Sequence, residues 1–300
     1  MTRGTDVSRA PGPRRVVYTA VISGYERLNE QPAARDSGID FVCFTDDDTV
    51  VSETWDVRVI EPRFPLDAVR SARYVKTMGP ILLADDDESL WIDNTVLLTA
   101  PPARIFDEWL ADADLGMPRH SLRRSVVAEF EAVATFGYDD AARVYEQLIQ
   151  YSQLDDAALR EVPFWTAILA RRHTPPVLAA MQTWYEHILR YSRRDQLSIN
   201  FVLRAAGVAV HAVEMDNARS EVHEWPIHNE RKWNVTRDRL GSALRVPLVE
   251  IGERDNEIRE LTERLDAERA RVEAMERAYT TSAYWRLTQP FRVLRAMFRR

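Results

Sequence analysis

Residues 89 to 98 read SLWIDNTVLL, and this stretch decides the fold class of the chain. Leu90 to Ile92 form an apolar run of strand length that ends abruptly at Asp93. In an open α/β sheet, the carboxyl end of such a strand opens onto the crevice in which ligands bind. Asn94 and Thr95 follow with short polar side chains, which allow a turn and offer oxygens to a metal ion or a sugar hydroxyl. The alternative is a surface acid that follows an edge strand.

The composition excludes several classes of protein. The 300 residues are 45% hydrophobic, which allows a sizeable core in one large domain or two smaller ones. The single cysteine, Cys43, lies in an apolar run, so we expect no disulfide, no cysteine-based zinc site and a cytoplasmic location. We find no run of eighteen apolar residues and no signal-peptide pattern. The net charge of −7 argues against a nucleic-acid partner.

Strand-like runs alternate with helical ones along the first two thirds of the chain, which predicts an α/β fold. Arg15 to Ile22 and Ile39 to Phe44 are β-branched and aromatic runs of strand length. A small-residue turn follows the first run, and a polar cap that contains Asp46 follows the second, so both ends suit a nucleotide site. No glycine-rich dinucleotide motif and no P-loop motif occurs in the sequence.

A cationic helix face precedes the strand that ends at Asp93. Asp67 to Leu83 has helical spacing, which places Arg70, Arg73 and Lys76 on one face. Three cations on one face can bind a diphosphate, although an ordinary solvated helix face has the same pattern. Because the acid-tipped strand follows directly, we favour the diphosphate interpretation.

A second informative stretch is Ser192 to Leu203, SRRDQLSINFVL, which predicts a helix with Asp195 and Gln196 in its first turn. An acid and an amide at this position can contact a sugar, or they can serve capping and the helix dipole alone. Farther along, His223 and His228 lie in a segment with two tryptophans. Such a segment can supply a metal ligand and a stacking surface for a sugar or a base.

The last fifty residues differ in character from the rest. Ile251 to Tyr279 places apolar residues seven apart among alternating charges, which predicts a coiled coil and a homo-oligomer, although Arg254 and Glu268 interrupt the d positions. Tyr284 to Arg300 has five arginines and no acid. An amphipathic helix of this kind can lie on an anionic membrane surface, and a solvated basic tail or a partner-binding helix is the alternative.

Several motifs occur in an order that resembles a known family. They are Tyr18-Thr19-Ala20, FVCFTDD at 41 to 47, RSARYVK at 70 to 76, SLWIDNTVLL, the segment from His120 to Glu129, RRHT at 171 to 174, and RDQLSINFVL at 194 to 203. From about residue 15 to about residue 230, the chain is similar to a glycosyltransferase-like family, long known as a domain of unknown function. Its members occur in bacterial polysaccharide gene clusters and among plant Golgi proteins of cell-wall and mucilage synthesis.

The resemblance implies a GT-A-like fold, in which helices flank a mixed, mostly parallel sheet and a nucleotide-sugar lies in the crevice. We therefore expect a disordered lead-in over residues 1–14 and a glycosyltransferase domain over 15–245. A coiled-coil helix over 250–282 and a basic amphipathic tail over 284–300 follow.

The resemblance also implies a donor site and an acceptor site. A nucleotide-sugar donor would be bound by residues that follow the strands or lie on the cationic helix: Thr19, Ala20, Tyr25, Asp46, Arg70, Arg73, Lys76, Asp93, Asn94 and Gln196. The acceptor would be a glycan, for which His120, Arg123 and Arg124 are further candidates.

A divalent metal ion is one of two alternatives for the donor diphosphate. In related enzymes, the position of Asp93 belongs to a D-x-D motif that holds Mn²⁺ or Mg²⁺, and His223 or His228 would complete the site here. Thr95 stands where the second acid is expected, so the motif is incomplete. The cations of the helix that precedes the motif are the other means of stabilising the leaving diphosphate.

The expected reaction is transfer of a sugar to a hydroxyl of a growing surface polysaccharide, at the inner face of the cell membrane. If the reaction inverts the anomeric centre, Asp195 or Glu129 is the candidate base; a retaining reaction needs no such base. The alternative is a non-catalytic scaffold that gathers polysaccharide enzymes at the inner membrane, and the incomplete D-x-D favours it.

Overall fold

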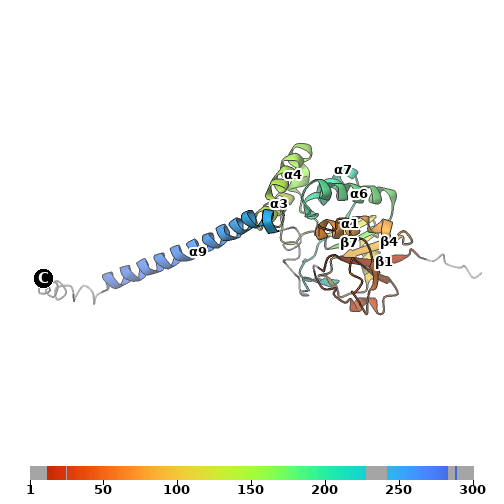
Figure 1. The fold of residues 1–300 in the computed structure, drawn as a ribbon, viewed down its shortest axis with the longest axis horizontal. Helices are drawn as coiled ribbons and strands as arrows, with labels where there is room; N and C mark the ends of the chain where they lie inside the picture. The colour runs from red at the N-terminus through yellow and green to blue at the C-terminus, as the bar shows by residue number, and fades with distance from the viewer. Residues whose placement is uncertain (1–11, 25, 228–241, 283–287, 289–300) are drawn as a thin grey trace, which may run out of the picture. The chain divides into compact units, whose positions relative to one another are not determined.

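The computed structural model describes residues 12–24, 26–227, 242–282 and 288. The chain divides into two compact units, Met1–Gly241 and Ser242–Arg300. The first unit is an α/β domain whose first strand, β1, begins at Arg15 (Figure 1).

The central sheet has seven strands in the order β3-β2-β1-β4-β7-β6-β8. Their bounds are β1 Arg15–Val21, β2 Asp40–Thr45, β3 Asp56–Val59, β4 Glu88–Ile92, β6 Leu115–Pro118, β7 Ile168–Arg172 and β8 His211–Val213. Strand β7 runs antiparallel to both its neighbours, and the other pairs are parallel. The predicted α/β class with a mixed, mostly parallel, helix-flanked sheet is therefore confirmed.

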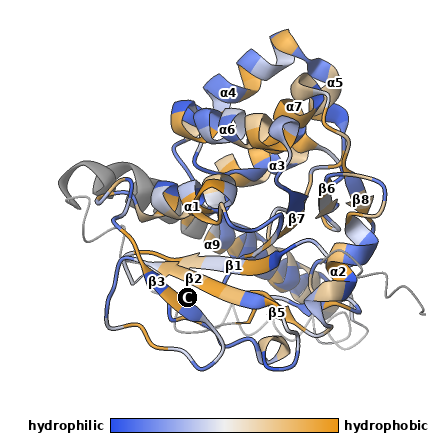
Figure 2. Ribbon diagram, turned by 90° about the vertical axis from the view of Figure 1, so that its right-hand side faces the viewer, coloured by the Kyte–Doolittle hydropathy of each residue, from blue (hydrophilic) through white to orange (hydrophobic). Residues whose placement is uncertain are grey.

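The central strands are buried on both faces, which explains why they read as nearly continuous apolar runs. In β1, Val16 and Tyr18 belong to one apolar cluster, and Val17 and Val21 belong to the cluster on the opposite face. Figure 2 shows the hydrophobic colour along β2 and much of β1. Helices α1 (Ala68–Leu82), α6 (Pro175–Arg190) and α7 (Gln196–Ala206) supply side chains to the first cluster, and α2 (Pro102–Trp109) supplies them to the second.

Smaller elements complete the domain. A third apolar cluster joins α3 (Val126–Thr135), α4 (Ala141–Leu154) and α5 (Asp156–Arg160) to α7. A short 3₁₀ turn, η1, covers Pro32–Ala34, and a two-stranded sheet pairs β5 (Leu97–Leu98) with β9 (His223–Glu224). This second pairing places the segment after Asp93 next to a segment more than a hundred residues away in the sequence.

Helix α1 contains a proline near its C-terminal end, and two side chains from the sheet repair the resulting gap in hydrogen bonding. Pro80 has no N–H to donate to the carbonyl of Lys76. The hydroxyl of Tyr18 and the guanidinium of Arg171 donate to that carbonyl instead, at 2.7 and 2.6 Å. A Cβ on Gly79 would lie 2.4 Å from the Tyr18 ring, so only glycine allows this approach. The backbone of Lys76 is thereby fixed against the sheet.

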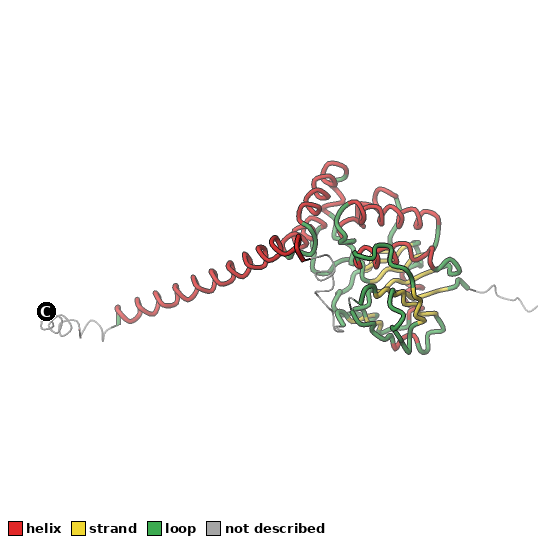
Figure 3. Tube along the Cα trace, in the orientation of Figure 1, coloured by secondary structure: helices red, strands yellow, loops and turns green. Residues whose placement is uncertain are grey.

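The second unit contains α9 (Ser242–Thr281), an unbroken helix (Figure 3). Its predicted seam residues are largely exposed: Ile258, Leu261, Leu265, Val272 and Met275. A coiled coil needs such a stripe to meet a second helix, so the coiled coil stays a prediction. Apart from Thr288, the predicted basic tail lies outside the described residues. In the part of the chain that the structure describes, no helix combines the length and apolar character needed to span a bilayer.

Candidate active site

Four charged side chains meet where β4 ends. Asp93 directly follows β4, Arg73 and Lys76 come from α1, and Asp195 directly precedes α7. The ammonium of Lys76 lies 2.6 Å from Oδ2 of Asp195 and 3.5 Å from Oδ1 of Asp93. The guanidinium of Arg73 lies 3.3 Å from Oδ1 of Asp195 and 3.8 Å from Oδ1 of Asp93. We call these four residues the charge tetrad, and it is formally neutral.

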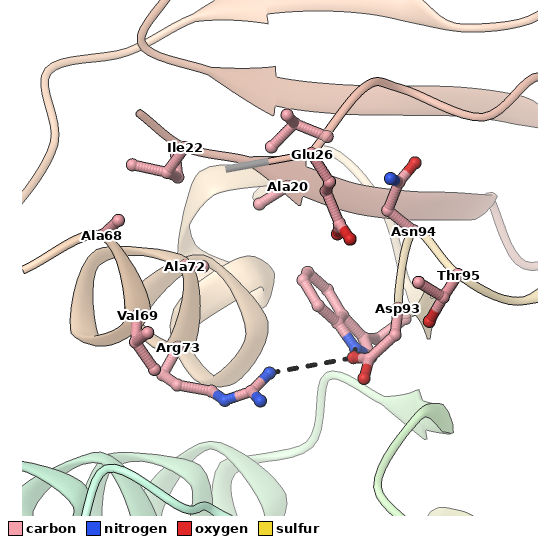
Figure 4. Close-up of a pocket in the computed structure, with 12 residues that line it drawn as sticks. Ala20, Ile22, Glu26, Ala68, Val69, Ala72, Arg73, Asp93, Asn94 and Thr95 are labelled. Atoms are coloured by element: carbon pink, nitrogen blue, oxygen red, sulfur yellow. Dashed lines mark hydrogen bonds and ion pairs between the residues drawn. The ribbon is translucent and has the colours of Figure 1, made fainter. Parts of the chain in front are cut away.

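The tetrad has a buried half and an accessible half. The side chain of Lys76 is 0% exposed and that of Asp195 is 3% exposed, whereas those of Arg73 and Asp93 are 16% and 30% exposed. Figure 4 shows the accessible pair facing each other beside a cavity. A ligand in the cavity therefore meets Arg73 and Asp93 first.

The carboxylate of Asp195 is held as a charged group. Thr166 donates to Oδ2 at 3.0 Å, and the indole N–H of Trp184 donates to the Asp195 carbonyl at 3.0 Å. Burial alone would raise the pKa of this carboxyl, but Arg73 and Lys76 outweigh burial and hold the pKa well below its usual range. The side chain makes no capping bond to α7, so the capping interpretation is wrong for this residue.

The ammonium of Lys76 is enclosed by acids and aromatic rings. Burial lowers its pKa, while Asp195 and Asp93 act in the opposite direction. The short contact to Asp195, together with the low pKa of that carboxyl, indicates an ammonium–carboxylate pair. The rings of Trp91 and Trp184 lie 5.6 and 5.9 Å from the nitrogen, within the range of cation–π attraction.

Two hollows lie side by side at this end of the sheet. A cavity of about 100 Å³ is lined by the end of β1, by α1 and by the segment after β4, and Ala20, Arg73 and Asp93 are among its lining residues. A larger hollow of about 490 Å³ lies between residues 24–30 and 45–51. Val21 and Glu26 line both, so the two hollows are adjacent.

Asn94 holds the loop that lines the larger hollow. Its side-chain oxygen Oδ1 accepts from the backbone N–H of Asn29 at 2.8 Å, and its side-chain Nδ2 donates to the backbone carbonyl of Arg27 at 2.9 Å. The side chain of Asn29 returns a bond to the backbone of Asn94 at 2.8 Å. Asn94 thus holds the backbone of residues 27–29 in place, and its side chain already has protein partners.

Three residues predicted to bind the donor are either buried away from the hollows or paired within the protein. Thr19 is fully buried in β1 and does not line either hollow. Asp46 accepts from the backbone and hydroxyl of Ser23 and so stabilises the turn after β1. Arg70 pairs with Asp67 and donates to the carbonyls of Ile188 and Tyr191 at the end of α6. Asp46 and Arg70 thus already have protein partners, and Thr19 lies away from both hollows.

The two further sugar-site candidates lie near the tetrad. Glu129, on α3, accepts from Arg123 at 3.0 Å. Burial raises the pKa of Glu129, Arg194 and Arg123 oppose the increase, and Asp195 adds to it, which places Glu129 within electrostatic reach of Asp195. The amide nitrogen of Gln196 is buried and has no hydrogen-bond partner in the structure. It is a donor that a sugar hydroxyl can satisfy.

The predicted histidine ligand is not available to a metal ion. His223 is fully buried, with Nδ1 2.8 Å from the Ser220 hydroxyl and Nε2 2.9 Å from the Asn217 carbonyl. Among the described residues, no group of three or more His, Cys, Asp or Glu side chains has the geometry for a metal ion. Tyr25 and His228 lie outside the described residues. Metal dependence therefore stays a prediction, and the described residues supply no free histidine ligand for it at this site.

Three residues that contribute to the site were not predicted from the sequence. Trp91 donates its indole N–H to Oδ1 of Asp93 at 2.7 Å, Thr166 donates to Asp195, and Glu26 lines both hollows. A signal was present for Thr166, which is a lone hydroxyl within the apolar run from Phe164 to Ala170. The long-range partners themselves have no local signature.

Comparison with known proteins identifies a family for most of this domain. The model of the TOD1/MUCI70 glycosyltransferase-like domain matches residues 16–220. The probable hexosyltransferase MUCI70 of Arabidopsis thaliana is 28% identical over 158 residues, which cover 49% of this chain and 27% of that protein, so the chain spans about a quarter of the length of that relative.

Two solved structures are similar at low identity. The apo bifunctional glycosyltransferase WbbM aligns with a TM-score of 0.42 and 11% identity, over 70% of this chain and 40% of that one. Mouse xyloside xylosyltransferase 1 aligns with a TM-score of 0.38 and 9% identity, over 68% and 85%. Because the family model covers more than half of the sequence, the chain belongs to the TOD1/MUCI70 glycosyltransferase-like domain family.

Proposed function

We propose that the chain transfers a glycosyl group from a nucleotide-diphosphate sugar to a hydroxyl of a glycan acceptor. The observation that carries the proposal is the charge tetrad, which lies beside a cavity at the carboxyl ends of β1 and β4. Ligands of open α/β sheets bind at such a crevice. Membership of a glycosyltransferase-like family supports the same reaction class.

The donor would occupy both hollows. The larger one, at about 490 Å³, is of the size of small-molecule pockets and suits a nucleoside. The diphosphate would then lie in the smaller cavity, next to the guanidinium of Arg73. A guanidinium binds phosphate oxygens in a two-pronged fashion and stabilises the negative charge that grows on the leaving nucleoside diphosphate.

The sugar and the acceptor would lie toward α7. Gln196 would donate its unsatisfied amide N–H to a sugar hydroxyl. The low pKa of Asp195 makes it a weak base, so its role would be to orient the sugar and the cations. The raised pKa of Glu129 brings it closer to the operating pH, and a base works best there. Glu129, which Arg123 contacts at 3.0 Å, is the other candidate base for an inverting reaction.

The test is a screen followed by a rate measurement. Nucleotide-sugars are screened by thermal shift, since a true donor stabilises the fold by mass action. Nucleotide release from the stabilising compound is then compared between the wild type and an Asp93→Ala variant. Loss of release in the variant supports the proposal. Equal release, or none from either protein, overturns it and favours the non-catalytic scaffold.

The cellular setting extends this proposal. We propose that the acceptor is a bacterial surface polysaccharide and that the protein works at the cytoplasmic face of the membrane, with a homo-oligomeric coiled coil in α9. The exposed heptad side chains of α9 and the five arginines of residues 284–300 support this arrangement.

A further inference from the structure

The two acidic side chains of the tetrad already share a cation. Asp93 comes from the end of β4 and Asp195 from the start of α7, and the ammonium of Lys76 lies between their oxygens, at 3.5 and 2.6 Å. The second cation, Arg73, contacts the same two carboxylates from the cavity side. Two positive charges thus compensate two negative ones.

A divalent metal ion does not fit these carboxylates as they stand. Mn²⁺ or Mg²⁺ needs oxygen ligands whose negative charge is not already compensated. Oδ1 of Asp93 accepts from Trp91 and faces Lys76, and both oxygens of Asp195 are engaged by Arg73, Lys76 and Thr166.

The neighbours of Asp93 do not restore a metal site. Thr95, in the second position of the incomplete D-x-D, accepts a hydrogen bond from Trp225 at 3.1 Å. Glu26 is the other carboxylate that lines the cavity, from the opposite loop (Figure 4). In the described parts of the chain, no cluster of three or more metal-binding side chains includes these acids.

We infer that the ammonium of Lys76 takes the place of the divalent cation, so that the donor diphosphate binds without a metal ion and contacts Arg73 directly. The inference rests on the proposed function for the presence of a diphosphate. Lys76 is a positioning residue in this arrangement: it neutralises carboxylates that would otherwise repel the phosphates. Without its charge, the remaining three members of the tetrad would carry a net charge of −1.

The structure holds this ammonium in place from two directions. Tyr18 and Arg171 bind the backbone carbonyl of Lys76, while Trp91 and Trp184 enclose the side-chain nitrogen. A bound metal ion is fixed by its ligands. This lysine is fixed by hydrogen bonds to its backbone carbonyl, by the two tryptophan rings and by the carboxylates of Asp93 and Asp195. The charge is therefore preorganised before the donor arrives.

The first test measures metal binding without any catalytic readout. Wild-type protein is titrated with MnCl₂ and bound Mn²⁺ is followed by electron paramagnetic resonance. We expect no saturable site in the wild type. A saturable site that disappears in Asp93→Asn would overturn the inference.

A gain-of-binding variant sharpens this test. Lys76→Met removes the cation between the two carboxylates, and we expect this variant to acquire Mn²⁺ binding. The matched control is the double variant Lys76→Met/Asp195→Asn, which removes one charge of each sign. We expect the control to bind no Mn²⁺. A folded Lys76→Met protein that binds no Mn²⁺ counts against the inference. If the single variant does not fold, the wild-type titration still decides.

The second test concerns the nucleotide. Binding of UDP and of GDP is measured by calorimetry in EDTA and in excess Mn²⁺. We expect the affinity of whichever nucleotide binds to change by less than about twofold between the two conditions, whereas at least a tenfold loss in EDTA would overturn the inference. If neither nucleotide binds in either condition, the proposed donor site is wrong. The Mn²⁺ titration then decides by itself whether the carboxylates bind a metal ion.

Discussion

The pairing of Lys76 with Asp195 predicts a large coupling energy between the two residues. We consider Lys76→Met, which keeps the length of the side chain, Asp195→Asn, which keeps its shape, and the double variant. Both side chains are at most 3% exposed, so solvent screening is small. Removing one partner of a buried ion pair leaves an uncompensated charge and typically costs about 3–5 kcal/mol.

The other contacts of the tetrad place each single variant near the lower end of that range. In Lys76→Met, Asp195 keeps Arg73 at 3.3 Å, and in Asp195→Asn the ammonium keeps Asp93 at 3.5 Å. We expect about 3 kcal/mol for each single variant and about 2–3 kcal/mol for the double variant, because replacing both partners leaves no orphaned charge between them. The coupling energy is then on the order of 3 kcal/mol.

The assay is urea unfolding at pH 7.5, followed by circular dichroism, for all four proteins of the cycle. The depressed pKa of Asp195 gives a further check. A carboxyl whose folded pKa is lowered stabilises the fold above its unfolded pKa, near 4, and loses this contribution as the pH falls through the folded value. The coupling should therefore be unchanged between pH 7.5 and pH 5.5. A coupling energy below about 0.5 kcal/mol would refute the pairing.

Three further predictions concern the frame of the site and the second unit. Gly79→Ala places a Cβ 2.4 Å from the Tyr18 ring and should lower the free energy of unfolding by about 1–3 kcal/mol. Urea unfolding measures this change. An unchanged midpoint would show that α1 can move away from Tyr18 without cost. Burial, with a smaller effect of Arg171, lowers the pKa of His173 to about 4. Below about pH 6.5, His173 therefore binds a proton in the unfolded chain but stays neutral in the folded chain. The free energy of unfolding should decrease from pH 7 to pH 5 by about 1 kcal/mol, after allowance for the partial exposure of the ring. His173→Gln should remove that part of the decrease, and an identical pH profile in the variant would contradict the assignment. Deleting residues 251–300 should reduce the oligomer mass in sedimentation and the flotation with anionic vesicles while nucleotide binding persists; unchanged sedimentation and flotation would assign that segment another role.

The sequence identified the edge of the sheet at which the site lies. Asp93 could be found because it ends an apolar run of strand length, and Asp195 because it lies at the start of a predicted helix. Arg73 and Lys76 could be found because helical spacing places them together. The structure joins these four residues, although a hundred residues separate the two acids along the chain.

The remaining details depend on contacts that no local pattern encodes. Arg70 shares the helical spacing of Arg73, yet it binds carbonyls at the end of α6, where a cation is favoured. His223 lies in a segment that could supply a metal ligand, but its side chain is fully buried, and Ser220 and Asn217 occupy both ring nitrogens. Tyr18 and Arg171 have roles that follow only from the position of Pro80 opposite the sheet.

The measurement that tests the central claim most directly is the rate of nucleotide release from the identified donor by an Arg73→Ala variant. Loss of one preorganised donor to the leaving group typically lowers the rate about 100-fold or more, and we expect a decrease of that size. Arg190→Ala, which removes the exposed pair between Arg190 on α6 and Glu146 on α4, is the matched control and should stay within about twofold of the wild type. If Arg73→Ala also stays within twofold, the tetrad is not the site of glycosyl transfer.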